Sequence, residues 1–105
     1  MSEEALREAL AGAAAELARF AAARDWEQFH TPKNLAMSLA IEAGEVMEHF
    51  QWTAMTPALD ADARAEVALE LADVFSYLLR LSSVLGIDLA AALAAKIAIN
   101  EQRYP

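Results

Sequence analysis

Two pairs of acidic side chains recur at the same spacing in a sequence with few other polar positions around them. The pairs are Glu42 with Glu45 and Glu70 with Asp73, and the members of each pair are three positions apart. Residues at this spacing share one face of a helix, so each pair would present two carboxylates side by side. Neighbouring carboxylates repel one another, and the repulsion is relieved by protonation or by a bound cation. The four acids are therefore candidate metal ligands.

The types of ligand predict which metal these acids would hold. Carboxylate oxygens without cysteine or paired histidine favour Mg²⁺, with Mn²⁺ as a substitute, over zinc. A di-iron site in a helical bundle would need Glu-x-x-His on two helices, whereas His49 lies four residues after Glu45. Mg²⁺ in proteins commonly shares its coordination with phosphate oxygens and water. We therefore predict a magnesium site for a phosphate-bearing substrate.

The stretches that carry the acids are apolar on most sides. Between Leu35 and Phe50 the polar residues fall mainly in one narrow sector, and the stretch from Glu66 to Leu85 repeats this arrangement. A helix that is apolar on nearly every side is normally buried on nearly every side. We therefore expect the two acidic sectors to face each other between packed helices.

Composition limits the class of protein. The chain has 105 residues, of which 57% are hydrophobic and only three are glycine and three proline. This excludes disorder and disfavours an all-β fold. A net charge of −8 disfavours binding to a nucleic acid polymer, and the absence of cysteine fits a reducing compartment. An acidic N-terminus and the lack of a long uncharged apolar run predict neither a secretory signal nor a membrane span. We expect one cytoplasmic domain over residues 1–105.

Capping signals predict four helices. The first spans about Glu3 to Arg24, and Thr31-Pro32 starts a second that ends near Trp52. Thr56-Pro57 is a start signal for the third, with residues 60–62 delaying the regular helix by a turn. It reaches Leu85 and stops at Gly86, and Asp88 caps a fourth from Leu89 to about Gln102. The predicted fold is an all-α four-helix bundle.

Such helices bury their apolar surface poorly in a chain this short. We therefore expect the bundle to be completed by self-association, as a homodimer or homotetramer. The alternative is a monomer with an unusually apolar surface.

A basic face is predicted on the last helix. Lys96, Asn100 and Arg103 follow at helical spacing, and a cationic face in an acidic chain could clamp a triphosphate. The alternative is a set of cations that stabilise a helix C-terminus.

Several separated motifs also resemble a known family. The pattern Glu42-x-x-Glu45 followed by Glu70-x-x-Asp73 is similar to the signature of the all-α MazG-like nucleoside triphosphate pyrophosphohydrolases. The segments that resemble the dCTP pyrophosphatase branch are Arg24–His30, Pro32, Asn34-Leu35, Phe50-Gln51-Trp52, Lys96, Asn100 and Gln102–Pro105. The resemblance covers roughly residues 17 to 105.

The resemblance implies hydrolysis of a nucleoside triphosphate between its α and β phosphates, giving the monophosphate and pyrophosphate. By the same resemblance, the four acids would hold Mg²⁺, a metal-polarised water would attack phosphorus, and Glu42 or Glu45 would take its proton.

The resemblance also implies a substrate pocket. Trp26 and Trp52 would be walls of a base pocket, which His30 would line and Tyr77 could reach. The alternative for both tryptophans is that they are core or interface anchors, and for Tyr77 that it is a buried tyrosine bonded to a backbone carbonyl.

One position departs from the dCTP pyrophosphatase pattern. At the position of Leu17, the dCTP pyrophosphatase branch has a histidine. dCTP and 5-modified dCTP are the first substrates to test, in a role of cleaning the dNTP pool. Other members of the superfamily suggest dUTP, non-standard purine triphosphates or phosphoribosyl-ATP as alternatives, and outside enzymes the alternative is a helical interaction module.

Overall fold

The structure is a computed structural model that describes residues 1–105, and it contains helices and no strands. The elements are α1 (Glu3–Ala23), the short 3₁₀ helix η1 (Glu27–Phe29), α2 (Pro32–Glu48), α3 (Ala61–Leu85) and α4 (Leu89–Arg103). The all-α prediction is confirmed.

Each α-helix begins at a polar cap. The side chains of Ser2, Thr31, Asp60 and Asp88 each accept a hydrogen bond from the backbone N–H three residues later. These bonds satisfy amide groups that have no partner within the helix. The predicted delay of the third helix beyond Thr56-Pro57 is confirmed, because Asp60 is the residue that caps α3.

Two helix ends have consequences for the site. The second helix is shorter than predicted, since α2 ends at Glu48 and not near Trp52, and His49 to Trp52 form turns. At the other end of the molecule, α1 ends where Asp25 adopts a positive φ of 56°. The N–H of Trp26 then donates to the carbonyl of Ala21 at 2.9 Å, which turns the chain back toward α1.

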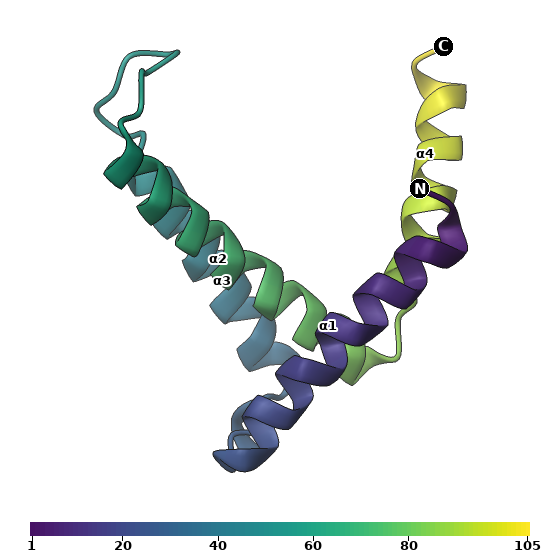
Figure 1. Cartoon of the computed structure of the whole chain (residues 1–105). Helices are drawn as coiled ribbons and strands as arrows, with labels where there is room; N and C mark the ends of the chain where they lie inside the picture. Colours follow the sequence, from purple (N-terminus) through teal and green to yellow (C-terminus); the bar gives the residue numbers. More distant parts are fainter.

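The helices form two arms that meet at an angle (Figure 1). In one arm α2 lies along α3, and in the other α4 lies against the N-terminal half of α1. The C-terminal half of α1 crosses α3 where the arms meet. At Gly86, with a φ of 67°, the chain leaves α3 and turns by 101° into α4. As a result α4 points away from the α2–α3 arm.

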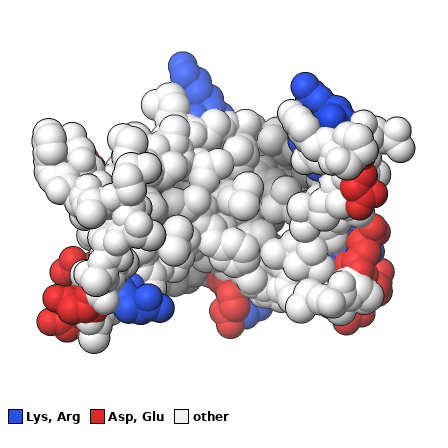
Figure 2. Space-filling view, turned by 90° about the horizontal axis from the view of Figure 1, so that it is seen from above, with Lys and Arg blue, Asp and Glu red and all other residues white.

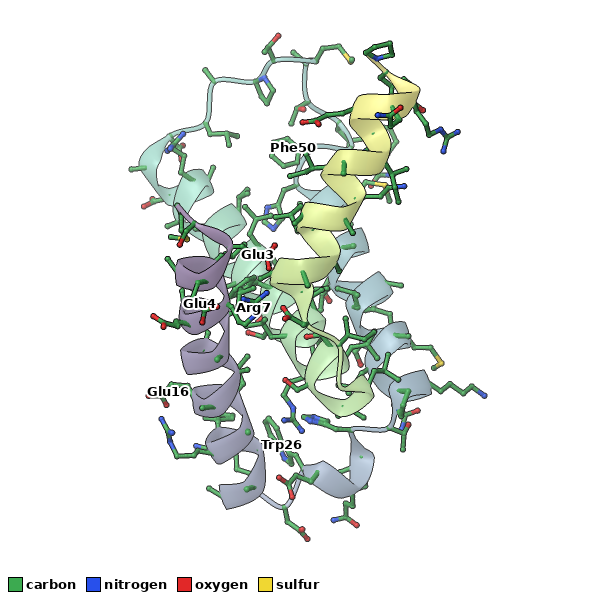
Figure 3. All side chains as sticks on the ribbon, turned by 90° about the vertical axis from the view of Figure 1, so that its right-hand side faces the viewer. Glu3, Glu4, Arg7, Glu16, Trp26 and Phe50 are labelled. Carbon is green, nitrogen blue, oxygen red and sulfur yellow. The ribbon has the colours of Figure 1, made fainter.

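An ion cluster fastens α4 to α1. Arg7 of α1 pairs with Asp88, the cap of α4, at 2.7 Å, and with Glu3 and Glu4 at 2.6 and 2.8 Å. Figure 3 shows Arg7 beside Glu3 and Glu4 near one end of α1, with Trp26 just beyond its other end. One side chain, Asp88, therefore both starts α4 and fixes it to the N-terminal half of α1.

The expectation that the apolar helices are buried is not met within one chain. The buried hydrophobic residues are Ala21, Leu35, Leu79 and Ala90, whereas Ile41 is 60% exposed and Leu69 70% exposed. Seen from above, charged side chains lie toward the edge of the molecule and the middle of this face is uncharged (Figure 2). A single copy thus leaves most of its apolar surface open.

None of the four helices combines the length and the hydropathy that a membrane-spanning segment requires. Only α3 and α4 taken together meet that criterion, and the sharp bend between them separates the two.

Candidate metal centre and adjoining cavity

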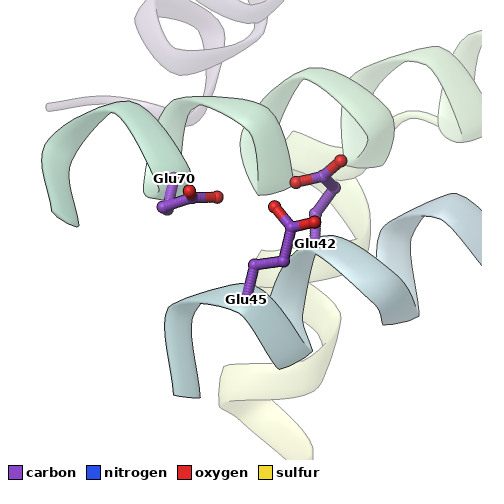
Figure 4. A group of neighbouring side chains, drawn as sticks. All are labelled: Glu42, Glu45 and Glu70. Carbon is purple, nitrogen blue, oxygen red and sulfur yellow. The ribbon is translucent and has the colours of Figure 1, made fainter. Parts of the chain in front are cut away.

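Three of the four predicted acids meet between α2 and α3. Glu42 and Glu45 extend from α2 toward α3, and Glu70 extends from α3 toward the same space (Figure 4). Each offers a carboxylate oxygen within 4.8 Å of the others, and all three side chains are partly buried. The spacing of Glu42 and Glu45 places both on the face of α2 that packs on α3.

The close approach of these carboxylates changes their protonation. Burial, hydrogen bonding to Glu45 and the charges of Glu45, Asp73 and Glu70 raise the pKa of Glu42 to about 7. The pKa of Glu70 is also raised, first by hydrogen bonding to Glu45 and then by burial. Without a cation, this cluster therefore holds protons well above the usual range for carboxyl groups.

The cluster also contains polar atoms that lack partners. One oxygen of Glu42 and one of Glu70 are buried and accept no hydrogen bond. Buried carboxylate oxygens are normally satisfied, so each of these has room for a further partner. The three acids offer hard oxygen ligands at close range, and they fit Mg²⁺ or Mn²⁺.

Asp73 and His49 lie beside the cluster. Asp73 is exposed and is not among the three converging acids, although its charge raises the pKa of Glu42 and of Glu70. The Nε2 atom of His49 lies 3.8 Å from Glu70, so this histidine is a polar neighbour of the acids. Asp73 thus lies between the acidic cluster and a cavity that it helps to line.

A cavity of about 420 Å³ adjoins the cluster on the other side of Asp73. Of the predicted pocket residues, Trp26, His30 and Tyr77 line it. Trp26 packs edge-on against Phe20 with their ring centroids 5.5 Å apart. The turn at Asp25 sets this position, because it brings the residue after α1 back against the last turns of that helix.

Other predicted site residues are not brought to this place within one chain. Trp52 is 88% exposed on the loop between α2 and α3, because α2 ends before reaching it. Lys96, Asn100 and Arg103 are exposed on α4, which packs against α1 and diverges from the acidic cluster. Within the single chain these residues lie apart from the acidic cluster, and their role in binding the substrate stays a prediction.

Sequence reasoning overlooked Arg80. It lines the cavity with Leu17, is only 9% exposed, and its Nε donates to Nδ1 of His30 at 3.2 Å. Its position three residues after Tyr77 placed it on the polar stripe of the third helix. A lone arginine on such a stripe usually lies in solvent, so the sequence carried no signal of its burial.

Comparisons with known proteins agree with this architecture. The model of the MazG-like family matches residues 37–105. The chain belongs to the MazG-like family. The resemblance noted in the sequence is thus confirmed.

Individual relatives extend the match toward the N-terminus. The chain is 46% identical over 92 residues to dCTP pyrophosphatase 1 of Mus musculus and 46% identical to that of Homo sapiens. Each match covers 84% of this chain and 54% of the relative, so the chain spans about half the length of these curated relatives. A crystal structure of a pyrophosphatase from Archaeoglobus fulgidus matches with a TM-score of 0.71 and 40% identity, covering 85% of each chain.

Proposed function

We propose that this MazG-like chain is a Mg²⁺-dependent nucleoside triphosphate pyrophosphohydrolase that acts on the dNTP pool. The observation that carries the proposal is the group of three half-buried carboxylates, with two unpartnered oxygens, beside an aromatic-lined cavity. The names of its relatives make dCTP and 5-modified dCTP the first substrates to test.

The acids and the cavity have separate roles in this proposal. Glu42, Glu45 and Glu70 would hold the metal, with Asp73 as a further ligand at the edge of the cavity. Bound Mg²⁺ would supply positive charge for the phosphate oxygens and would make a nearby water more acidic. Glu42 or Glu45 would take a proton from the attacking water, whose oxygen bonds to the α-phosphorus while pyrophosphate leaves. Trp26 would stack on the base, with His30 and Tyr77 around it.

We also propose that the active form is a homodimer or homotetramer. The exposed apolar residues on α2, α3 and α4 support self-association, as does the small number of buried residues. A neighbouring chain could bring its Trp52 and its Lys96, Asn100 and Arg103 to the acidic cluster, which the single chain does not do. In that arrangement Arg103 would bind phosphate oxygens in pairs and Lys96 would add a point charge.

The decisive experiment follows the oxygen of the water. The purified chain is incubated with Mg²⁺ and each dNTP in ¹⁸O-labelled water. The products are then separated, and the mass of each is measured by mass spectrometry. Attack at the α-phosphorus puts the label into the monophosphate and leaves the pyrophosphate unlabelled.

The control and the contrary results are equally direct. EDTA in place of Mg²⁺ should stop the reaction. Labelled inorganic phosphate with a nucleoside diphosphate would show attack at the γ-phosphorus and would refute the proposed cleavage. Absence of any turnover across common and modified triphosphates would favour the helical interaction module.

A further inference from the structure

One hydrogen bond ties the connector between α1 and α2 to α3. In this connector, residues 24–31, the other hydrogen bonds run to α1, to α2 or within the connector itself. The exception is the bond from Nε of Arg80 on α3 to Nδ1 of His30, at 3.2 Å. Arg80 is therefore the one hydrogen-bond partner that the connector has on α3.

Arg80 is suited to hold another side chain in place because it is itself buried. It is nine-tenths buried toward the end of α3, next to the fully buried Leu79. Its guanidinium forms no ion pair with a carboxylate of the chain. Burying a charge without an anionic partner lowers stability, so packing alone does not explain an arginine at this position.

His30 can accept the bond from Arg80 because it is neutral. An imidazole nitrogen accepts a hydrogen bond only when it carries no proton. Burial and the positive charge of Arg80 lower the pKa of His30, and the charge of Glu27 opposes this shift. The neutral ring then carries its proton on Nε2 and leaves Nδ1 as the acceptor.

His30 belongs to a wall that is shared by two cavities. Trp26, His30 and Tyr77 line the 420 Å³ cavity beside Asp73, and they also line a second cavity of about 360 Å³. The remaining residues of the second cavity come from η1 and α2. The three shared residues thus lie between the two cavities, and the Arg80–His30 bond attaches this wall to α3.

Trp26 is held in this wall by its neighbours and not by burial. It is 44% exposed, and the aromatic rings near it are those of Phe20 and His30, with centroids 5.5 and 6.4 Å away. Phe20 lies on α1, whereas His30 is attached to α3 through Arg80. Loss of the bond from Arg80 would free His30 and leave Trp26 supported by Phe20 alone.

We propose that Arg80 is a positioning residue for the substrate pocket: by holding His30 against α3, it fixes the wall on which Trp26 receives the base. This inference rests on the proposed function and deepens it, since Arg80 acts on the substrate through His30. Each side chain that must be ordered on binding weakens affinity by about two- to tenfold, and Arg80 orders the wall beforehand. The effect belongs to KM, because other residues form the acidic cluster.

Two substitutions of equal length separate the bond from the packing. Met and Gln both reach as far as Nε of arginine, but only Gln has an N–H group at that position. Arg80→Met should raise KM for dCTP, or for whichever dNTP is turned over, at least about fivefold, with kcat reduced less than about twofold. Arg80→Gln should keep KM within about twofold of the parent value. A KM unchanged in Arg80→Met, or raised equally in both variants, would overturn the inference.

Controls distinguish positioning from a loss of fold and from direct contact. A smaller folded fraction lowers kcat and leaves KM unchanged, which is the opposite pattern. Arg64→Met, a change of an exposed arginine on the same helix, should match the parent in both constants. In a His30→Leu background, Arg80→Met should cause no further rise in KM, and a further rise would contradict action through His30.

A measurement without substrate separates this inference from the proposed function. In a Trp52→Phe background, Trp26 is the only tryptophan, so its fluorescence reports on the wall. Arg80→Met should raise the constant for quenching of Trp26 by acrylamide, and Arg80→Gln should not. If this pattern is found and no triphosphate is hydrolysed, the proposed function fails and the positioning of Trp26 stands. Quenching unchanged in Arg80→Met overturns the inference, whether or not triphosphates are hydrolysed.

Discussion

At the scale of single residues, the acidic cluster determines what the chain can bind. Three carboxylates at this distance are stable as a group only when protonated or paired with a cation. Because the pKa of Glu42 is raised to about 7, a bound metal ion has to displace a proton from the cluster below neutral pH.

Stability of the metal-free protein should therefore depend on pH. The folded chain keeps a proton on Glu42 up to about pH 7, whereas the unfolded chain loses it near the ordinary value of 4.5. Between these values the folded state binds more protons, so stability falls as pH rises. With EDTA present, we expect Tm to decrease between about pH 5 and pH 8, and Glu42→Gln to reduce the decrease.

Added Mg²⁺ should reverse this trend. Its ligands must be deprotonated, so the rise in Tm on adding metal should be larger at about pH 8 than at about pH 5. Glu48→Gln, a change at an exposed position on the same helix, is the matched control and should behave as the parent chain. An equal rise at both pH values would contradict a carboxylate metal site.

Individual ligands should be indispensable for turnover. Mutating even the hydrogen-bond partners of metal ligands typically lowers metal affinity or activity by about 10- to 100-fold, so loss of a ligand should cost at least as much. Glu45→Gln and Asp73→Asn should therefore each lose at least nine-tenths of kcat/KM. Both chains should remain folded by circular dichroism, because each change removes a repelling charge. Glu66→Gln on α3 serves as the control. Activity above a tenth of the parent in both variants would exclude these residues as ligands.

At the scale of elements, the turn after α1 determines whether the cavity exists. Asp25 adopts a left-handed conformation, which aspartate and glycine tolerate and a β-branched residue does not. Its carboxylate also accepts a hydrogen bond from Gln28 at 3.0 Å. The turn places Trp26 against Phe20 and opposite Tyr77.

Substitutions at Asp25 test this role. Asp25→Val should lower the free energy of unfolding by about 1–2 kcal/mol in urea titrations, because its Cβ substituents clash in that conformation. Asp25→Gly should be tolerated much better. We expect only the valine variant to shift the emission of Trp26 in the Trp52→Phe background. Equal loss in both variants would indicate that the bond to Gln28, and not the backbone conformation, stabilises the turn.

At the scale of the whole molecule, one chain holds the acids and the basic face on different arms. Arg7 and Asp88 fix α4 against α1, so α4 cannot fold back onto α2 without breaking this ion cluster. The apolar residues left exposed on both arms are the surfaces through which a second copy would pack. The proposed site shared between chains has a specific test.

Mixing two inactive variants should restore activity. If Arg103 serves a neighbour, co-expression of Glu45→Gln with Arg103→Ala yields mixed oligomers that contain sites with both intact groups. We expect double-tag-purified mixed oligomers to regain at least about a tenth of the parent turnover, whereas each variant alone stays inactive. Failure to recover activity in verified mixed oligomers would place Arg103 outside the neighbour's site.

Much of this protein is determined by local sequence. Ser2, Thr31, Asp60 and Asp88 define helix starts because capping involves groups only three residues apart, and Gly86 defines a helix end for the same reason. The spacing of Glu42 and Glu45 places them on one face of a helix whatever surrounds it. The all-α class, the acidic pairs and the family resemblance could therefore be read directly.

Tertiary structure alone decided which of these residues meet. It brought Glu70 to the pair on α2 and set Asp73 at the edge of a cavity. It also left Trp52 and the basic face of α4 elsewhere and buried Arg80 against His30. These outcomes depend on the angles between helices, and those angles follow from packing and from turns such as Asp25 and Gly86. Helical periodicity predicts on which face of its helix a residue lies. Contacts between segments distant in the sequence determine which other element packs against that face.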